Sequence, residues 1–320
     1  MGPFDRAQWQ VLSQSLQLAR AADRDVDFAV DTTDLLDVDR CRSILDAVGP
    51  AIGSPSRVVT ASLLAKRIAF LATGPSLYAM SAFNLGLNLA RENCITEYAH
   101  RDGLWQSRMV LKDLAVDRPE DGRRGEWRER VMQRVFAEHL TPLWGTLHEA
   151  CGIAPRILWE NTAVRVFSLY ERRLAKLDSE PARRQARDDF DYLMHRAPGR
   201  VFGLAAHPLI RFFSPVGSRH VASTASMPRG ARPKAAQPKA AQPKAAIPNA
   251  TIPEAARPRA AIPEAAVSKN ATCEIAIRET ALPETAIRFR KTCCLYFKAT
   301  QPAAYCSTCP LIRPGAVKPR

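Results

Sequence analysis

The chain has 320 residues, and 46% of them are hydrophobic, which is enough for one or two globular domains with a substantial core. Its formal net charge of +14 suggests an acidic partner, but residues 227–320 hold most of the excess, with 16 Lys and Arg against 5 Asp and Glu. Residues 1–226 are nearly neutral, and the basic tail has few aromatic residues that could stack on bases. The sequence therefore predicts no nucleic-acid binding.

The N-terminus has no basic segment followed by an apolar one, so we expect no secretory signal and a cytoplasmic protein with reduced thiols. Residues 68–90 contain no charged residue, but Gly74-Pro75 and several Ser and Asn interrupt them. A membrane-spanning helix needs about 20 mostly apolar residues. We therefore predict buried core helices here, with an interfacial or re-entrant segment as the alternative.

Residues 1–217 are expected to form a mainly α body, because their apolar residues recur at spacings of three and four. Gly74-Pro75 should end or kink one long helix, because proline lacks the N–H that an interior helical position needs. The helices are predicted at 7–20, from Ser54-Pro55 to Gly74, from Ser76 onward, at 126–150, at 157–175 and at 181–196.

A five-residue repeat with the approximate unit Ala-x-Pro-Lys/Glu-Ala follows the helical body. Proline occupies every fifth position from Pro228 to Pro263 and returns at Pro283. Such spacing prevents a continuous helix or a central strand, and alanine offers little surface to bury. Residues 218–287 are therefore predicted to be a disordered spacer, with a β-solenoid as the alternative.

Four of the eight cysteines lie within 17 residues near the C-terminus. They are Cys293, Cys294, Cys306 and Cys309. Four thiols this close can hold an iron–sulfur cluster or a zinc ion, or form two disulfides. A reducing compartment disfavours disulfides. Adjacent cysteines diverge in extended backbone, which favours a two-iron cluster over one tetrahedral zinc ion.

The other four cysteines are interpreted as unrelated to this site. Cys41, Cys94 and Cys151 occur singly in segments predicted to be helical. A buried free cysteine behaves as a small hydrophobic residue, so they are interpreted as core residues. Cys273 occupies a proline position of the five-residue repeat and is interpreted as a substitution within it.

The pattern Cys-Cys, eleven residues, then Cys-x2-Cys-Pro resembles the C-terminal motif of the FhuF-type ferric-siderophore reductase family. The stretch from Arg156 to Asn161 resembles the Leu-Trp-x-Asn helix start of that family, and Leu77-Tyr78-Ala-Met-Ser resembles its central region. The likeness covers most of 1–216 and 288–313. It departs from the family pattern in the proline-alanine spacer, which separates the body from the cysteines.

The resemblance implies a [2Fe–2S] cluster held by the four cysteines in a small C-terminal lobe at 288–320. It implies a ferric siderophore as substrate and an external electron donor of the ferredoxin or flavin-reductase type. A position at the inner membrane near a siderophore importer is a further implication. By the same resemblance, four residues of one helix would line a substrate cleft, namely Arg156, Trp159, Asn161 and Arg165. The alternative is that they belong to an ordinary amphipathic helix with a core tryptophan.

The leading hypothesis is thus a one-electron reductase that releases iron from a ferric siderophore. No G-x-G-x-x-G follows a strand pattern and no Walker loop occurs, so we expect no nicotinamide or nucleotide site. The first alternative is a zinc-binding structural or interaction protein with a flexible basic arm. The second is a siderophore-assembly ligase, which should be longer and should have a nucleotide site.

Five basic residues flank the cysteines, namely Arg288, Arg290, Lys291, Lys298 and Arg313. Positive charge near a cluster favours its reduced form and raises its potential. It also steers an acidic donor or an anionic chelate toward the site. A solvated basic tail without a specific role is the alternative.

Overall fold

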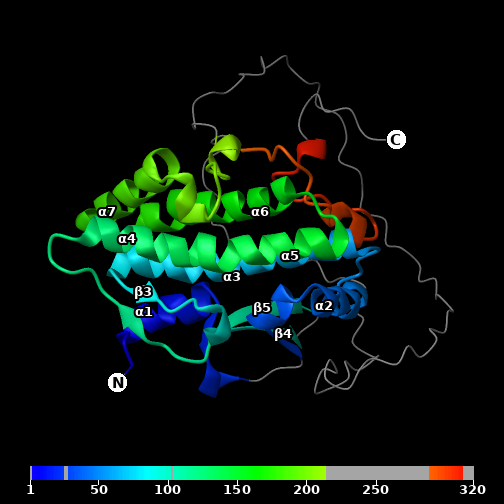
Figure 1. The fold of residues 1–320 in the computed structure, drawn as a ribbon, viewed down its shortest axis with the longest axis horizontal. Helices are drawn as coiled ribbons and strands as arrows, with labels where there is room; N and C mark the ends of the chain where they lie inside the picture. Colours follow the sequence, from blue (N-terminus) through cyan, green and yellow to red (C-terminus); the bar gives the residue numbers. More distant parts are fainter. Residues whose placement is uncertain (1, 25–27, 102–103, 214–287, 313–320) are drawn as a thin grey trace, which may run out of the picture.

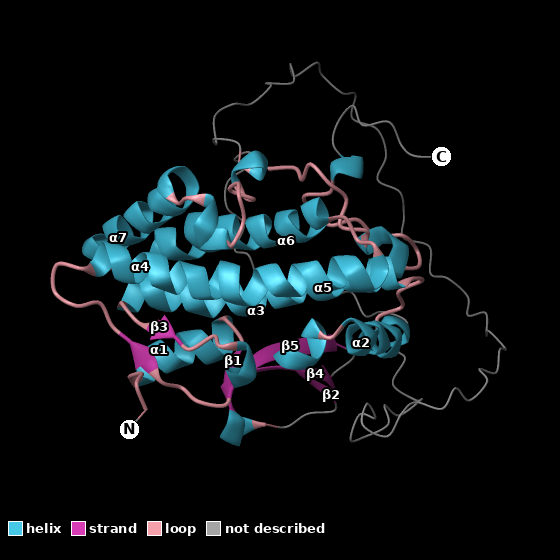
Figure 2. Cartoon of the chain, viewed as in Figure 1, coloured by secondary structure: helices cyan, strands magenta, loops and turns pink. Residues whose placement is uncertain are grey.

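The computed structural model describes residues 2–24, 28–101, 104–213 and 288–312, and the chain is mainly helical, as predicted. Most of the helices lie on one side of a small sheet (Figures 1 and 2). The predicted spacer at 218–287 lies outside the described residues. The α-helices are α1 (Arg6–Gln10), α2 (Val38–Ala51), α3 (Arg57–Phe83), α4 (Arg124–Gln133), α5 (Thr141–Cys151), α6 (Pro155–Ser168) and α7 (Glu180–Asp191).

Four segments with the wider π-helical turn continue these helices. The segments are Val11–Ser15, Arg134–Leu140, Leu169–Arg173 and Tyr192–Arg196. The helix predicted at 126–150 is therefore one helical run from α4 through α5. The helices predicted at 157–175 and 181–196 are confirmed as α6 and α7 with their π-helical continuations.

Helix α3 lies at the centre of the fold and packs on α2, α6 and α7. The predicted end at Gly74-Pro75 is wrong, because α3 runs through Pro75 to a left-handed cap at Asn84. An interior proline costs about 3 kcal/mol. Leu71, Leu77 and Met80 around it are fully buried, and each such side chain stabilises the fold by about 1.5–3 kcal/mol. Burial on all sides therefore outweighs the lost hydrogen bond.

Helix α3 is also the one helix in the described part of the chain that is long and apolar enough to cross a membrane. Of its most apolar 18-residue window, 78% is buried inside the fold. The prediction that residues from 68 onward belong to core helices is thus confirmed for the part that lies in α3.

A four-stranded sheet, which the sequence patterns did not predict, covers the other side of α3. Its order is β1-β5-β4-β2, with β1 parallel to β5 and the remaining pairs antiparallel. The helix predicted at 7–20 ends early: the helical turns stop at Ser15, and residues 18–20 form β1. The strands are β1 (Leu18–Arg20), β2 (Phe28–Asp31), β4 (Cys94–Arg101) and β5 (Leu104–Leu111), and a separate pair is formed by β3 (Gly86–Leu87) and β6 (Val116–Asp117).

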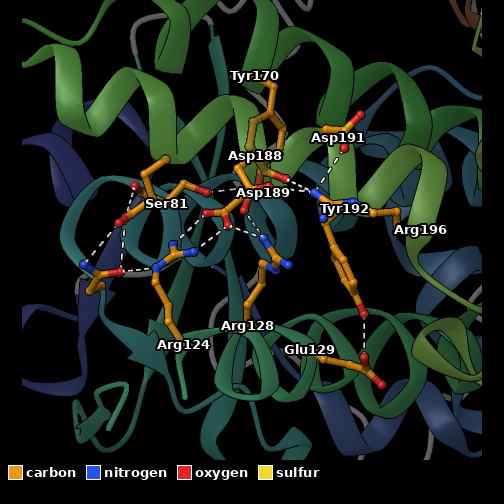
Figure 3. Close-up of polar contacts among 12 residues, drawn as sticks. Ser81, Arg124, Arg128, Glu129, Tyr170, Asp188, Asp189, Asp191, Tyr192 and Arg196 are labelled. Carbon is orange, nitrogen blue, oxygen red and sulfur yellow. Dashed lines mark hydrogen bonds and ion pairs between the residues drawn. The ribbon is translucent and has the colours of Figure 1, made fainter. Parts of the chain in front are cut away.

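A buried ionic network ties α4 to α7 (Figure 3). The fully buried Asp189 carboxylate accepts two hydrogen bonds from Arg124, at 2.7 and 2.8 Å, and one from Arg128 at 3.2 Å. Arg128 also bonds Asp188 at 2.6 Å and lies 4.0 Å from the centre of the Tyr192 ring. Because Asp189 is satisfied by two guanidinium groups, the network fixes α7 against the central run of helices.

We expect Asp189→Asn to lower the free energy of unfolding by about 2–3 kcal/mol, because two guanidinium groups lose the charge that compensates them. Urea unfolding followed by circular dichroism measures the change. Asp191→Asn is the matched control, since Asp191 is exposed and pairs with Arg196 at 3.0 Å; its effect should be about 0.5 kcal/mol or less. Equal effects of the two substitutions would contradict the role assigned to the network.

Candidate functional site

Residues 288–312 lie against one end of the helical body, beside α6 and α3 (Figure 1). We call this segment the C-terminal lobe. The Ser62 hydroxyl of α3 donates a hydrogen bond to the carbonyl oxygen of Cys294 at 2.8 Å. Cys294 is 1% exposed. The lobe therefore docks by buried, directed contacts that involve the cysteine segment itself.

Glu160 of α6 holds the backbone that leads into the paired cysteines. Its carboxylate accepts hydrogen bonds from the backbone N–H of Lys291 at 2.5 Å and of Thr292 at 2.7 Å. The Thr292 hydroxyl donates to the same carboxylate. Glu160 is 2% exposed, so these donors satisfy a carboxylate that has lost its water. The two residues before Cys293 are fixed by this single side chain.

Asn161 joins three parts of the site. Its amide nitrogen donates to the backbone carbonyl of Ser62 on α3 at 3.0 Å. Its amide oxygen accepts a hydrogen bond from Arg290 of the lobe at 2.6 Å. The Arg290 guanidinium is buried and lies 3.9 Å from the Glu160 carboxylate. Helices α3 and α6 thereby present a polar platform on which the lobe rests.

Two further contacts hold the outer edge of the lobe. Arg288 pairs with Glu171 at 2.8 Å and stacks over the ring of Phe167, with 4.8 Å between guanidinium carbon and ring centre. The Lys291 ammonium donates to the backbone carbonyl of Arg211. Together with Arg290, three of the five flanking basic residues are thus engaged in docking.

The structure brings together predicted cysteines from the two halves of the motif. The sulfur atoms of Cys294 and Cys306 lie 3.7 Å apart. Burial, and then the neighbouring thiols of Cys294 and Cys309, raise the pKa of Cys293. Two sulfurs bound to one tetrahedral ion at about 2.3 Å are separated by about 3.7 Å. The pair of Cys294 and Cys306 therefore already has the spacing that one metal centre requires.

The four cysteines do not gather into one compact group. Within the described residues, no three His, Cys, Asp or Glu side chains are gathered closely enough to hold a single metal ion. A lone zinc ion needs four ligands around one point, whereas a [2Fe–2S] cluster takes two thiolates at each of two irons. The donor set thus fits the cluster better than zinc.

The backbone between the two halves of the motif is adapted to this arrangement. Leu295 has a φ of +62°, a left-handed conformation that costs a non-glycine residue about 1–2 kcal/mol. Its N–H points to the sulfur of Cys293 at 3.3 Å, and the N–H of Cys309 donates to the carbonyl of Cys306 at 2.9 Å. The turn at Leu295 reverses the chain directly after the adjacent cysteines, so that both can face the second half of the motif.

Positive charge lies beside the Cys294 and Cys306 thiols. The ammonium of Lys66, on α3, lies 3.8 Å from the sulfur of Cys294. The pKa of Cys294 is lowered, first by the hydrogen bond from Cys306 and then by Lys66 and Arg290. That shared hydrogen bond raises the pKa of Cys306, because Cys306 keeps the proton. Burial lowers the pKa of Lys66, and the Cys294 sulfur opposes this effect.

The residues predicted to line a cleft do not share one surface. Trp159 is 7% exposed and packs edge-on against the Phe202 ring, and Asn161 is buried under the lobe. Arg156 is exposed, and Arg165 is half-buried near the ring of Phe70. Asn161 therefore positions Arg290, and Trp159 belongs to the core.

The sequence patterns did not single out the platform residues of the body. Ser62 and Lys66 sit in an apolar helix more than 200 positions before the cysteines, and nothing in their local sequence indicates a site. Glu160 could have been noticed, because a carboxylate between Trp159 and Asn161 on a buried helix face needs a partner.

Comparison with protein families agrees with this geometry. The family model described as ferric iron reductase FhuF-like transporter matches residues 62–214, and the FhuF 2Fe-2S C-terminal domain model matches residues 290–311. Together the two matches cover more than half of the chain. The chain belongs to the FhuF-like family. The C-terminal match shows a [2Fe–2S] cluster as the cofactor of this family member, and it leaves the zinc alternative without support. No curated protein and no solved structure matches the chain.

Proposed function

We propose that this FhuF-like protein reduces ferric siderophore complexes by one electron and so releases Fe(II). We further propose Cys293, Cys294, Cys306 and Cys309 as the cluster ligands. The observation that carries the proposal is the 3.7 Å approach of the Cys294 and Cys306 sulfurs in a lobe that docks on the polar platform of α3 and α6, inside the segment that matches the 2Fe-2S domain.

The chemistry follows from the electron count. When bound, the cluster supplies one electron at a time, which is what reduction of Fe(III) to Fe(II) requires. An external donor of the ferredoxin or flavin-reductase type is proposed as the source of that electron. Oxygen-rich chelators hold the hard ferric ion more firmly than the ferrous ion. The protein therefore need not break the chelator to release the metal.

The exposure of the lobe suggests where a large chelate approaches. Cys293 and Cys306 are half-buried, whereas Cys294 and Cys309 are buried. Tyr305, next to Cys306, is 46% exposed and stacks on Phe297 with 5.6 Å between ring centres. An electron can pass to a chelate that rests on this outer side, so no deep pocket is required.

We propose a cytoplasmic location, with transient association near a siderophore importer as the alternative. The burial of α3 inside the fold supports the cytoplasmic location. On this view the apolar helix stabilises the body and does not anchor it in a bilayer.

Metal analysis of the purified protein tests the proposal. We expect about two iron and about two sulfide per chain with visible absorption. We also expect anaerobic release of Fe(II) from at least one of a panel of hydroxamate, catecholate and carboxylate chelates. A colourless protein with one zinc per chain would contradict the proposal. An intact cluster that reduces none of the chelates would contradict its substrate class alone.

A further inference from the structure

Lys66 is a cation of the helical body whose side chain reaches the cysteine site. Its ammonium lies 3.8 Å from the Cys294 sulfur and 5.3 Å from the centre of the Tyr296 ring. The side chain is covered by the docked lobe, so water screens its charge less than it screens an exposed lysine. Ser62, Glu160 and Asn161 already make the hydrogen bonds that dock the lobe. Lys66 therefore adds a positive charge beside the Cys294 sulfur, which the docking hydrogen bonds do not supply.

A second cation lies in the same part of the site. Arg290 is buried and adds a second positive charge on the side of Cys294. The same two cations also act on Cys306, whose sulfur lies 3.7 Å from that of Cys294. The positive charge therefore acts on this pair of thiols, and Cys294 is the most buried of the four cysteines.

We propose that Lys66 sets the reduction potential of the cluster by holding its ammonium against the Cys294 sulfur. This inference rests on the proposed function, in which Cys294 is a cluster ligand. Reduction adds one negative charge to the cluster, and a nearby cation stabilises the more negative state. Lys66 thus raises the potential and widens the range of donors that can deliver the electron. It is a tuning residue and does not take part in the reaction itself.

Anaerobic redox titration of Lys66→Met against wild type tests the inference, with absorption and the electron paramagnetic resonance spectrum of the reduced protein as readouts. At a fixed potential we expect the ratio of reduced to oxidised protein to fall about tenfold in Lys66→Met, which is a shift of about 59 mV for one electron. Lys66→Arg keeps the charge and should stay within about twofold of wild type. Lys298→Met removes an exposed cation from the same lobe, and water should limit its effect to about twofold.

Iron and sulfide analysis of each variant separates the possible outcomes. A Lys66→Met protein with a full cluster and the wild-type potential would overturn the inference. Lys66→Gln, which keeps a hydrogen-bond donor without the charge, replaces Lys66→Met if the latter does not assemble, and the same shift is expected. Loss of the cluster in both uncharged variants would make Lys66 an assembly residue and would also overturn the inference. Wild-type protein without iron and sulfide would instead contradict the proposed function.

Discussion

Cys294→Ser protein should be purified colourless, with its bound iron and sulfide reduced at least about 100-fold relative to wild type. The reason is that thiolates are the iron ligands of such clusters. Loss of a residue that only hydrogen-bonds to a metal ligand already weakens metal binding by about 10–100-fold. Cys294 sits at the centre of the site, 3.7 Å from the Cys306 sulfur and hydrogen-bonded through its carbonyl to Ser62. Visible absorption, iron and sulfide assays and ferric-chelate reduction measure the loss. Cys306→Ser should give the same result.

Cys151→Ser is the matched control for the cysteine substitution. Cys151 is a half-buried free cysteine at the end of α5, and its sulfur donates to the carbonyl of Leu147 at 3.1 Å. A serine hydroxyl can make the same hydrogen bond, so this variant should keep its cluster and its activity. A coloured, active Cys294→Ser protein, or a colourless Cys151→Ser protein, would show that the ligand assignment is wrong.

Glu160→Ala is expected to detach the lobe from α6. The substitution leaves two backbone N–H groups and the Thr292 hydroxyl without their acceptor, and it removes the carboxylate nearest to the buried Arg290. Each buried donor left unpaired costs about 1–3 kcal/mol, and loss of one partner of a buried charge pair costs about 3–5 kcal/mol. We therefore expect the free energy of unfolding to fall by about 3–5 kcal/mol.

The same substitution should make the protein lose its cluster more readily, because Lys291 and Thr292 directly precede Cys293. Urea unfolding measures the stability, and the rate of bleaching by an iron chelator measures cluster retention. Glu171→Gln is the control, since Glu171 makes a partly exposed pair with Arg288 and should contribute about 1 kcal/mol or less. If Glu160→Ala and Glu171→Gln gave the same stability and the same bleaching rate, the docking role assigned to Glu160 would be wrong.

The helical body was predictable because its evidence is local. Apolar residues at helical spacing predicted α4 to α7 within a few residues, and the spacing of four cysteines predicted the lobe. The strands β4 and β5 were missed, although Asp102-Gly103 between two runs of β-branched and aromatic residues is a strong hairpin signal. The course of α3 through Pro75 was also missed, since it depends on burial by neighbours that no local pattern reveals.

The platform of the site could not be derived from the sequence, because its contacts are long-range. Ser62 and Lys66 meet Cys294 only after α3, α6 and the lobe have come together, and 79 residues separate Phe213 from Cys293. The resemblance pointed to Asn161, but as a contact for substrate. The structure shows its partner to be Arg290, which a pattern within one helix cannot indicate.

A single-turnover experiment tests the central claim most directly. Purified protein is reduced anaerobically, freed of excess reductant and mixed with a ferric siderophore and a chromophoric Fe(II) trap in a stopped-flow instrument. Transfer of one electron per cluster predicts one trapped Fe(II) per protein, appearing at the rate at which the oxidised absorption returns. Cys294→Ser should give no trapped Fe(II). Recovery of the oxidised absorption without trapped Fe(II), or a reduced protein that stays reduced with every ferric chelate, would contradict the account.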